Sequence, residues 1–535
     1  MNDPERTLPA RGTALVLALV AALLLLRLGS VPLLGPDEPR YARVAVEMHR
    51  SRDFVTPTLQ GRPWMEKPAL YYWMAARAFD ALGENEAAAR LPAVLAGLLL
   101  AGATGLVGAR LYGGPCGLWA AVIVGTSLLP FAYARAASMD MLVAATITVA
   151  IGLAALRLLG IAGALALPAA GAAAGLATLA KGPIGLLVPA LVLAGYVLAT
   201  REWSLLRRLL SPAAALVFLA VAAPWYLLVY RAQGQAFVDV FLLDHNVRRF
   251  TSTIHNHPGP PWYYLPVLLA GLFPWTGLLV PAAAEARAKD RRDLLLVCWL
   301  GLPLVFFSLA GSKLPGYILP CLPPLAILMG RAAARLHEAA SPGGALTRRA
   351  VALVTLALCA VVAALPLVLL RQHDPAWVLA LPLGAWSLLV GWSVSRRIAH
   401  DPAGALRLLR VGAPGLLILL ALAAPLVLGR RESGRAFYAD THGREVLVWG
   451  AWRTAWMSGY FYNDGRVREV AGLQEIGPAA TAAPALVLCG PAERRTLQRA
   501  PGLSARTMAE GPRGNVLLEV RSRAAEGAPP PPAAP

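Results

Sequence analysis

The chain has few charged residues. Only 15% of its 535 residues are Asp, Glu, Lys or Arg, whereas a soluble domain carries about a quarter. Hydrophobic residues make up 57% of the sequence, and the mean hydropathy is +0.57. This composition excludes an ordinary soluble globular protein and indicates a chain that crosses a membrane many times.

Cysteine is also scarce. The chain has five cysteines, and four of them lie within or at the ends of apolar segments. None forms the close pair that a zinc site or a redox motif requires. The sequence therefore predicts packing roles for the cysteines and no disulfide. The five are Cys116, Cys298, Cys321, Cys359 and Cys489.

Acidic residues are fewer than basic ones, 30 against 49, which gives a net charge of +19. A basic excess of this size can indicate nucleic-acid binding, but such proteins gather Lys and Arg on one face. Here the basic residues are scattered through short loops between apolar runs. We therefore expect no nucleic-acid partner, and we attribute the excess to orientation in a membrane.

Thirteen apolar runs follow one another along the chain. Each is close to the roughly 20 residues that a helix needs to cross a hydrocarbon core of about 30 Å. The sequence thus predicts a polytopic α-helical membrane protein with about 13 transmembrane helices. The runs lie near residues 12–34, 90–111, 115–133, 139–160, 162–180, 183–199, 209–230, 263–284, 294–311, 316–336, 350–370, 376–395 and 410–429.

Alternate loops between these runs are strongly basic, as the positive-inside rule requires of the cytoplasmic face. They are residues 201–208, 285–293, 331–349 and 395–410. With this orientation, every loop that carries chemically distinctive residues opens on the outer side. We expect a multi-pass protein of the inner (plasma) membrane with its site outside the cytoplasm.

Polar and charged residues separate short apolar runs after the last helix. Strand-like runs at 445–450, 485–490 and 515–520 surround a helical candidate at 452–462, which predicts a small α/β domain on the outer side. The expected organisation is a transmembrane domain with its first outer loop, the α/β domain, and a disordered Pro/Ala tail. Their ranges are 1–430 with the loop at 35–89, then 431–522, then 523–535.

The first outer loop holds an acidic pair directly after the first apolar run, so Asp37 and Glu38 are expected at the membrane surface. Asp37 is the candidate general base, because a carboxylate there can take a proton from an acceptor hydroxyl. Asp140, at the outer start of the fourth run, is its alternative or its partner. Asp140 can equally be the N-cap of that helix. Two helices along the interface are expected in this loop, one after residue 41 and one over 69–82.

Several cations lie in the outer loops. A phosphate-bearing substrate needs such cations to offset the charge of a phosphate leaving group, although any one of them can instead extend to lipid phosphates. Glu66, beside Lys67, either pairs with a base or joins His245 as a ligand of a divalent ion. The cations are Arg40, Lys67, Arg135, Lys181 and Lys313.

The loop at 231–262 combines His, Asn, Arg and aromatic residues, in DHNVRRF at 244–250 and HNHPGPPWYY at 255–264. Such side chains can hydrogen-bond to a sugar and stack on it. The same aromatics also anchor proteins at the membrane interface, so both interpretations stay open.

Six motifs occur in a characteristic order: PDEPRYA at 36–42, EKP at 66–68, YYW at 71–73, KGP at 181–183, HN and RF within 245–250, and KLPGYILP at 313–320. In this order they resemble the bacterial 4-amino-4-deoxy-L-arabinose lipid A transferases and related members of the dolichyl-phosphate-mannose protein mannosyltransferase superfamily. The resemblance implies a C-type glycosyltransferase fold. It also implies a polyprenyl-phosphate (undecaprenyl) sugar donor that is used outside the cytoplasm.

The resemblance also implies roles for single residues. Asp37 and Asp140 match the outer-loop acids, and Trp64 stands where the aminoarabinose enzymes have Tyr, which puts the identity of the sugar in doubt. Glu66 and His245 match the pair associated with a divalent metal. Donor-phosphate contacts are expected from Arg40, Lys67, Tyr317, Lys313 and Arg135, and substrate contacts from Glu38, Trp64 and Asn246.

The sequence thus predicts a membrane glycosyltransferase that acts by direct displacement at the anomeric carbon. Its expected partners are the lipid-linked sugar, a lipid A or other envelope-glycan acceptor, and membrane lipids. One alternative is protein O-mannosyltransferase-type transfer to Ser or Thr. Another is a lipid-linked sugar flippase, but transport normally requires charges near the middle of the membrane, and the apolar runs have almost none.

Overall fold

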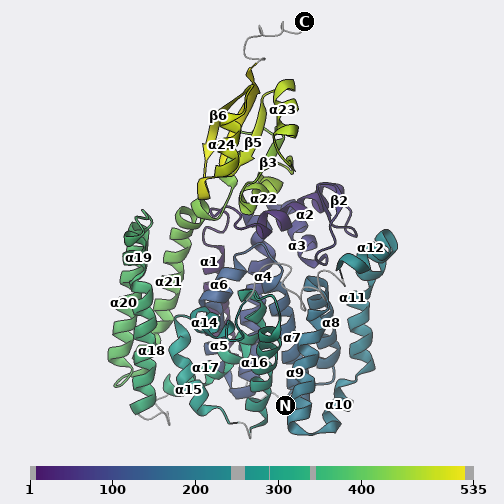
Figure 1. Cartoon of the computed structure of the whole chain (residues 1–535). Coiled ribbons are helices and arrows are strands. Elements are labelled where there is room, and N and C mark those ends of the chain that lie inside the picture. Colours follow the sequence, from purple (N-terminus) through teal and green to yellow (C-terminus); the bar gives the residue numbers. More distant parts are fainter. Residues whose placement is uncertain (1–7, 242–258, 288–289, 338–344, 524–535) are drawn as a thin grey trace.

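The computed structural model describes residues 8–241, 259–287, 290–337 and 345–523. A bundle of long helices carries a small α/β domain at one end (Figure 1). Each of the thirteen apolar runs contains helix. The predicted class, a polytopic helical membrane protein with a small α/β domain, is confirmed.

The bundle helices begin and end close to the predicted runs. In chain order they are α1 (Ala10–Leu25), α4 (Glu86–Tyr112), α5 (Gly114–Gly125), α6 (Leu128–Ala134), α7 (Asp140–Leu158), α8 (Ala166–Lys181), α9 (Ile184–Thr200), α10 (Trp203–Leu209), α11 (Pro212–Gln233), α12 (Gln235–Phe237), α14 (Tyr264–Gly271), η3 (Trp275–Leu278), α15 (Leu279–Glu285), α16 (Arg291–Leu309), η4 (Pro315–Cys321), α17 (Leu322–His337), α18 (Ala345–Ala363), α19 (Leu365–Arg371), α20 (Trp377–Arg397) and α21 (Pro402–Arg431).

Two of the predicted spans are bent. α5 and α6 meet at 62°, and α14 meets the segment Trp275–Glu285 at 107°. Within the described residues, eight helices are long and apolar enough to cross a membrane, or ten if each bent pair is one span. The count of thirteen spans therefore stays a prediction.

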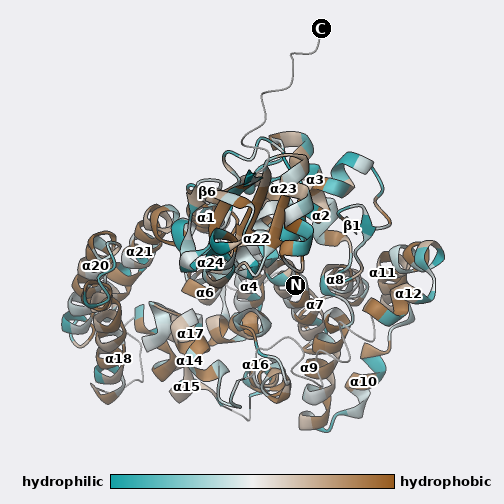
Figure 2. Cartoon of the chain, turned by 45° about the horizontal axis from the view of Figure 1, so that its top comes forward, coloured by the Kyte–Doolittle hydropathy of each residue, from teal (hydrophilic) through white to brown (hydrophobic). Residues whose placement is uncertain are grey.

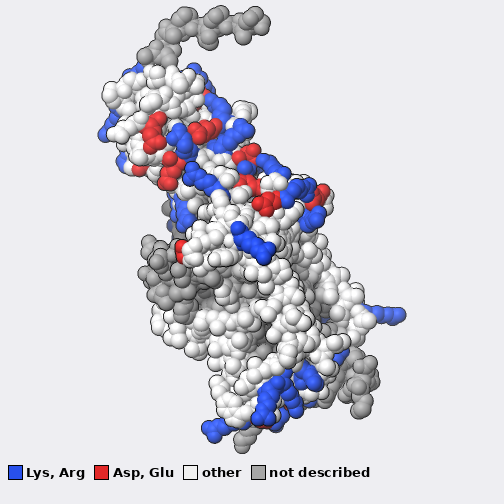
Figure 3. Space-filling view, turned by 90° about the vertical axis from the view of Figure 1, so that its right-hand side faces the viewer, with Lys and Arg blue, Asp and Glu red and all other residues white. Residues whose placement is uncertain are grey.

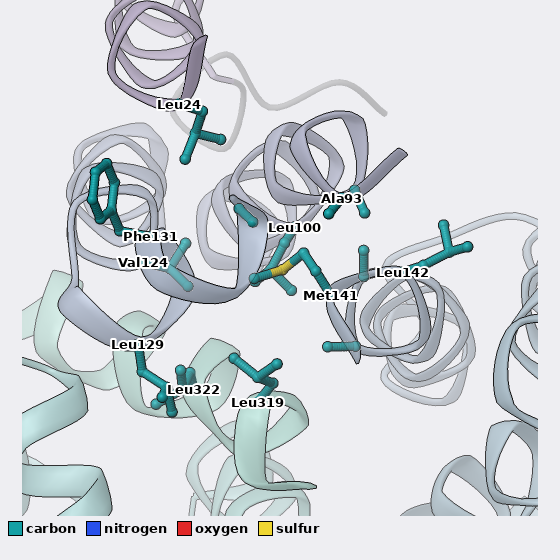
Figure 4. Close-up of a cluster of buried hydrophobic side chains, with 14 of the residues drawn as sticks. Leu24, Ala93, Leu100, Val124, Leu129, Phe131, Met141, Leu142, Leu319 and Leu322 are labelled. Carbon is teal, nitrogen blue, oxygen red and sulfur yellow. The ribbon is translucent and has the colours of Figure 1, made fainter. Parts of the chain in front are cut away.

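The centre of the bundle is an apolar core shared by helices that are distant in the sequence. Figure 4 shows Leu24 of α1, Leu100 of α4 and Met141 of α7 in one buried cluster with Leu319 and Leu322, where η4 passes into α17. Close approach of neighbouring helices depends on small residues. A Cβ at Gly117 of α5, for example, would lie 2.7 Å from the Cβ of Ala109 in α4. This core fixes α1, α7 and η4, which all lead into the outer loops.

The first outer loop folds into the two predicted interfacial helices, α2 (Asp37–Ser51) and α3 (Leu70–Leu82), joined by a hairpin of β1 (Thr58–Leu59) and β2 (Arg62–Pro63). Asp37 and Glu38 lie in the first turn of α2, where carboxylates favour the positive end of the helix dipole. Gln60 and Gly61 form the hairpin turn with φ of 54° and 72°. A two-residue turn of this kind requires positive φ at both positions.

The C-terminal domain has a five-stranded sheet in the order β4-β3-β5-β7-β6. β3 is parallel to β4 and β5, and β7 is antiparallel to β5 and β6. The predicted helix at 452–462 is α22. The elements are η5 (Arg435–Tyr438), β3 (Val446–Trp449), α22 (Arg453–Tyr462), β4 (Val467–Glu469), α23 (Leu473–Ala482), β5 (Ala485–Cys489), α24 (Pro491–Arg499), β6 (Leu503–Glu510), η6 (Pro512–Gly514) and β7 (Val516–Ser522).

The domain is attached to the outer loop by polar contacts. Asp464 Oδ1 accepts from Arg43 Nη1 at 2.5 Å and from Arg50 Nη1 at 2.6 Å, so it binds two arginines of α2. Gln60 Nε2, at the hairpin tip, donates to the carbonyl oxygens of Gly465 and Val467 at 2.8 and 2.9 Å. α2 and α3 therefore lie between the bundle and the sheet, as a roof over the membrane-facing part (Figure 1).

Charge is distributed along the length of the molecule in zones. Figure 3 shows charged side chains concentrated on the α/β domain and outer loop at one end and at the opposite end of the bundle, with a largely uncharged zone between them. Hydrophobic residues dominate the bundle helices in Figure 2. α10 and α15, beside two of the basic loops, lie at the end opposite α2 and α3 (Figure 1). This arrangement agrees with the predicted sorting of the loops.

We expect Glu47→Gln to destabilise the outer loop. Glu47 accepts hydrogen bonds from Arg43 Nε, the Thr58 hydroxyl and the backbone N–H groups of Gln60 and Gly61, at 2.8 to 3.1 Å. Loss of the charged acceptor should cost about 2 kcal/mol of unfolding free energy. Thermal unfolding in detergent measures this, and Glu469→Gln, on an exposed stretch of β4, is the control.

The loss of stability caused by Glu47→Gln should depend on pH. Burial raises the pKa of Glu47, but the hydrogen bonds from Arg43, Gly61 and Thr58 outweigh it, and the pKa lies below its usual value of 4.5. A carboxylate with a lowered folded pKa stabilises the fold above its unfolded pKa, and this contribution is lost as the pH falls. The difference between wild type and Glu47→Gln should therefore shrink below roughly pH 4.5. A difference that grows in acid would contradict the assignment.

Candidate active site

Four charged side chains of the outer loop form one continuous chain. Arg40 Nη2 contacts Asp37 Oδ1 at 2.6 Å and Glu66 Oε2 at 3.4 Å. Lys67 Nζ lies 3.2 Å from Glu66 Oε1. Asp37 is 55% exposed, whereas the side chains of Arg40, Glu66 and Lys67 are at least 90% buried. Asp37 and Lys67, 30 positions apart in the sequence, therefore belong to one cluster that runs from solvent into the protein.

Aromatic side chains surround this cluster. The guanidinium carbon of Arg40 lies 5.3 Å from the ring centroids of both Tyr41 and Trp64. Three buried polar atoms here have no hydrogen-bond partner among the described residues: Arg40 Nε, Trp64 Nε1 and Tyr72 OH. Buried donors without partners are rare in folded proteins. They suit a polar ligand that enters the cluster.

The pKa shifts reflect the same surroundings. Burial lowers the pKa of Arg40, but the carboxylate of Glu66 opposes it, and the net pKa lies above the ordinary value, so Arg40 stays a cation. Burial, and then the charge of Glu66, raises the pKa of Tyr72 well above its usual value. Tyr72 is therefore a neutral hydroxyl that can donate a hydrogen bond at physiological pH.

A second polar group is formed by α7, α8 and η4. Asp140, in the first turn of α7, accepts a hydrogen bond from Lys181 Nζ at the end of α8. Lys181 Nζ also lies 5.0 Å from the ring centroid of Tyr317 in η4. A Cβ at Gly316 would lie 2.6 Å from Tyr133 Cε1 and 3.1 Å from Asp140 Oδ1. Only glycine leaves room at position 316 for this arrangement.

Shared packing connects the two groups. Met65 and Ala69, which flank Glu66 and Lys67, pack in one hydrophobic cluster with Leu179 and Trp225. Leu179 precedes Lys181 by two positions on α8. Trp225 Nε1 of α11 donates to the carbonyl of Val55 in the outer loop at 3.0 Å. The outer loop thus lies directly against the ends of α8 and α11.

The other expected phosphate contacts lie in different surroundings. Lys313, in the connection before η4, is buried and donates to the carbonyl of Ala310 at 2.7 Å. Arg135 Nη1 donates to the carbonyls of Leu23 and Leu24 in α1 at 3.1 and 2.7 Å. These hydrogen bonds tie Arg135 to α1, and its role as a donor-phosphate contact stays a prediction.

Glu38 has internal partners. Its carboxylate accepts from Arg90 Nη2 at 2.6 Å, from the Ala137 N–H at 2.7 Å and from the Leu34 N–H at 2.8 Å. Only 7% of the residue is exposed. These bonds connect the start of α2 with α4 and with the connection before α7, so the structure gives Glu38 an architectural position. Its expected substrate contact stays a prediction.

Of the two expected metal ligands, only Glu66 lies in the described part of the chain. His245 and Asn246 lie outside the described residues, so their predicted roles stay predictions. Across the described ranges, no three His, Cys, Asp or Glu side chains group in a way that could hold a metal ion, and Glu66 is paired with Arg40 and Lys67. The described residues alone thus do not make a metal site around Glu66.

Three neighbours of these groups, Arg90, Tyr72 and Tyr133, were not predicted as such from the sequence. Arg90 could have been found, because a charged residue inside an apolar helix is costly unless it has a partner. Tyr72 was noted only as part of an aromatic run, and no signal in the sequence distinguishes its hydroxyl from that of Tyr71. Tyr71 donates to the carbonyl of Ala89 at 2.8 Å.

Comparison with known proteins identifies the family. A Pseudomonas fluorescens protein (strain ATCC BAA-477 / NRRL B-23932 / Pf-5), described as undecaprenyl phosphate-alpha-4-amino-4-deoxy-L-arabinose arabinosyl transferase 2, is 33% identical over 436 residues, 76% of this chain and 72% of its own. The chain belongs to this arabinosyl transferase family. A profile described as dolichyl-phosphate-mannose-protein mannosyltransferase matches residues 66–227 of this chain.

Other members match over less of their length. The arabinosyl transferase of Edwardsiella ictaluri (strain 93-146) is 35% identical over 320 residues, and the match spans 57% of each chain. For that of Pseudomonas paraeruginosa (strain DSM 24068 / PA7), the match is 35% identical and spans 66% of each. The chain thus matches between about half and two thirds of the length of these two relatives.

A solved structure of the arabinosyl transferase family matches almost the whole fold. It is described as ArnT from Cupriavidus metallidurans bound to undecaprenyl phosphate, and it superimposes with a TM-score of 0.78 at 27% identity. The match covers 95% of this chain and 98% of the solved chain. The predicted resemblance and the predicted C-type glycosyltransferase fold are both confirmed.

The adjacent acids Asp37 and Glu38 should differ in their effect on stability. Glu38→Gln leaves the buried Arg90 without its counter-charge, which should cost about 3 kcal/mol. Asp37→Asn removes an exposed partner of Arg40 and should cost less than about 1 kcal/mol. Thermal unfolding of both variants in the same detergent measures this contrast. Equal loss in both would contradict the architectural position of Glu38.

Proposed function

We propose that this protein is a glycosyltransferase that moves 4-amino-4-deoxy-L-arabinose from undecaprenyl phosphate to lipid A. The observation that carries the proposal is the Asp37–Arg40–Glu66–Lys67 cluster, found in a chain of the arabinosyl transferase family. Likeness over nearly the whole fold to a structure described as bound to undecaprenyl phosphate supports the choice of donor.

The proposed donor phosphate lies against the cationic side chains of the cluster. Arg40 and Lys67 are buried, so their charges act in a low dielectric and interact more strongly with a phosphate than they would in water. Lys181 and Tyr317 approach from α8 and η4. As the bond between the anomeric carbon and the phosphate oxygen breaks, the leaving phosphate gains negative charge, which these groups stabilise.

Asp37 is the proposed base. The acceptor oxygen attacks the anomeric carbon, its new bond to carbon forms as the bond to the donor phosphate breaks, and Asp37 orients this oxygen or takes its proton. The pair with Arg40 at 2.6 Å keeps Asp37 next to the cation that contacts the leaving group. Asp140, paired with Lys181, orients that lysine beside Tyr317.

We place the reaction on the outer side of the inner membrane. α10, within the basic loop at 201–208, and α15, which ends where the basic loop at 285–293 begins, lie at the end of the bundle opposite α2 and α3 (Figure 1). The positive-inside rule assigns such loops to the cytoplasm. The cluster then opens outward, beneath the C-terminal domain. Glu66 and His245 are the proposed ligands of a divalent metal ion.

Mass spectrometry tests the proposal directly. Purified protein, incubated with undecaprenyl-phosphate aminoarabinose and lipid A, should raise the mass of lipid A by one aminoarabinose residue and release undecaprenyl phosphate. Asp37→Asn should slow this transfer by about 10²- to 10⁴-fold. Full activity in Asp37→Asn would remove the proposed base. A parallel reaction also contains a Ser/Thr peptide, and glycosylation of that peptide with unmodified lipid A would favour protein O-glycosylation.

Gly316→Ala should impair the same reaction. Its Cβ would displace Tyr133 and the Asp140–Lys181 pair, and misplacement of catalytic groups by about 1 Å costs about 10²-fold in rate. Gly301→Ala in α16 is the matched control, because nothing lies within 4 Å of the added Cβ. The transfer rates of the two variants are measured and compared. Equal rates would contradict the proposal that η4 places the Asp140–Lys181 pair for the reaction.

A further inference from the structure

A cavity on another side of the bundle is lined by Glu38 and Arg135 but not by Asp37, Arg40, Glu66 or Lys67. Its volume is about 350 Å³, and it lies between the α1–α2 connection and α6 on one wall and α19, α20 and α21 on the other. Figures 1 and 2 show α18, α20 and α21 set to one side of the bundle. Aliphatic side chains dominate the lining, among them Leu34, Leu369, Leu379, Leu383, Leu420 and Leu428.

A second cavity of about 610 Å³ continues from the first. The two share Ala376, Leu379 and Val427, so they form one recess. The second part is polar: its lining includes His373, Arg430 and Arg431 at the ends of α19 and α21. We call the two parts the α6–α21 recess. It has an aliphatic interior and a basic mouth, as a site for an amphiphile requires.

The recess holds more positive than negative charge. Arg431 is paired with Asp374, and Arg90 with Glu38. Arg135, which lines the interior, and Arg430, which lines the mouth, have no carboxylate within ion-pair distance in the described part of the chain. Arg135 is bound to the carbonyls of Leu23 and Leu24, whereas Arg430 is exposed at the mouth and can contact an anionic occupant.

The recess opens at the same end of the bundle as the active site. The backbone carbonyl of Glu432, directly after α21, accepts a hydrogen bond from the Gly35 N–H at 2.9 Å. Gly35 lies next to the start of α2. Nearby leucines such as Leu367, Leu381 and Leu426 are exposed, as expected of helices that face lipid. An occupant can thus enter sideways from the leaflet in which α2 lies.

We propose that the α6–α21 recess binds an anionic glycerophospholipid of that leaflet, with an acyl chain along the aliphatic interior and the phosphate at the basic mouth. On the cytoplasmic side of membranes, basic pockets between helices bind anionic lipid headgroups, and the recess has the same combination of aliphatic and basic residues at the outer end. The lipid then bridges the α1–α2 connection and α6 on one wall and α19, α20 and α21 on the other. An interior of about 350 Å³ is small for a lipid with many acyl chains, which favours a glycerophospholipid over the proposed acceptor.

Native mass spectrometry of the full chain tests this with dioleoyl-phosphatidylglycerol and dioleoyl-phosphatidylcholine as probes. Wild type should retain phosphatidylglycerol in preference to phosphatidylcholine. Arg430→Gln should weaken that preference by roughly fivefold. Arg371→Gln is the matched control, because Arg371 is an exposed arginine at the end of α19 that does not line the recess. Ala424→Phe, which fills the interior, should weaken binding of both lipids.

Three results would overturn the proposal. The first is equal retention of both lipids by wild type, and the second is an unchanged preference in Arg430→Gln. The third is Ala424→Phe protein that retains phosphatidylglycerol but loses transfer to lipid A, which would make the recess an acceptor site. The lipid retained in native mass spectrometry does not depend on transferase activity. The lipid-binding proposal and the proposed function can therefore fail independently.

Discussion

The buried pair of Glu38 and Arg90 holds the outer part of the molecule in place. Arg90 donates to the carbonyls of Leu28, Val31 and Pro32 as well as to Glu38. These carbonyls belong to the stretch where the chain leaves α1, which has no helix to satisfy them. In a membrane-level environment such groups must be paired within the protein. One arginine thereby fixes the exit of α1, the first turn of α2 and the position of Asp37.

Much of the fold could be predicted because the membrane limits the solutions. An apolar run of about 20 residues has to form helix to satisfy its backbone, and helix lies at all thirteen runs. The bends between α5 and α6 and after α14 were not predictable, because hydropathy carries no information on direction. The hairpin at Gln60 and Gly61 was also missed, since strands of two residues leave no periodic pattern.

The candidate site was predicted in part. The order of the motifs placed Arg40, Glu66 and Lys67 together, and the structure joins them. The sequence favoured Asp37 as the base and Glu38 as a substrate contact, but it could not show which of the two faces inward, since neighbours on a helix point about 100° apart. Which one faces inward depends on Arg90, 52 positions away in the sequence. Arg135 was grouped with the other outer cations, because the sequence does not show that it binds the carbonyls of Leu23 and Leu24. Its role as a phosphate contact stays a prediction.

The half-exposed position of Asp37 sets the side from which the cluster can be approached. Its carboxylate is open to water, while the side chains of Arg40, Glu66 and Lys67 are enclosed by the protein. For the proposed reaction, an acceptor can therefore reach Asp37 from the aqueous side without displacing any of the three enclosed side chains.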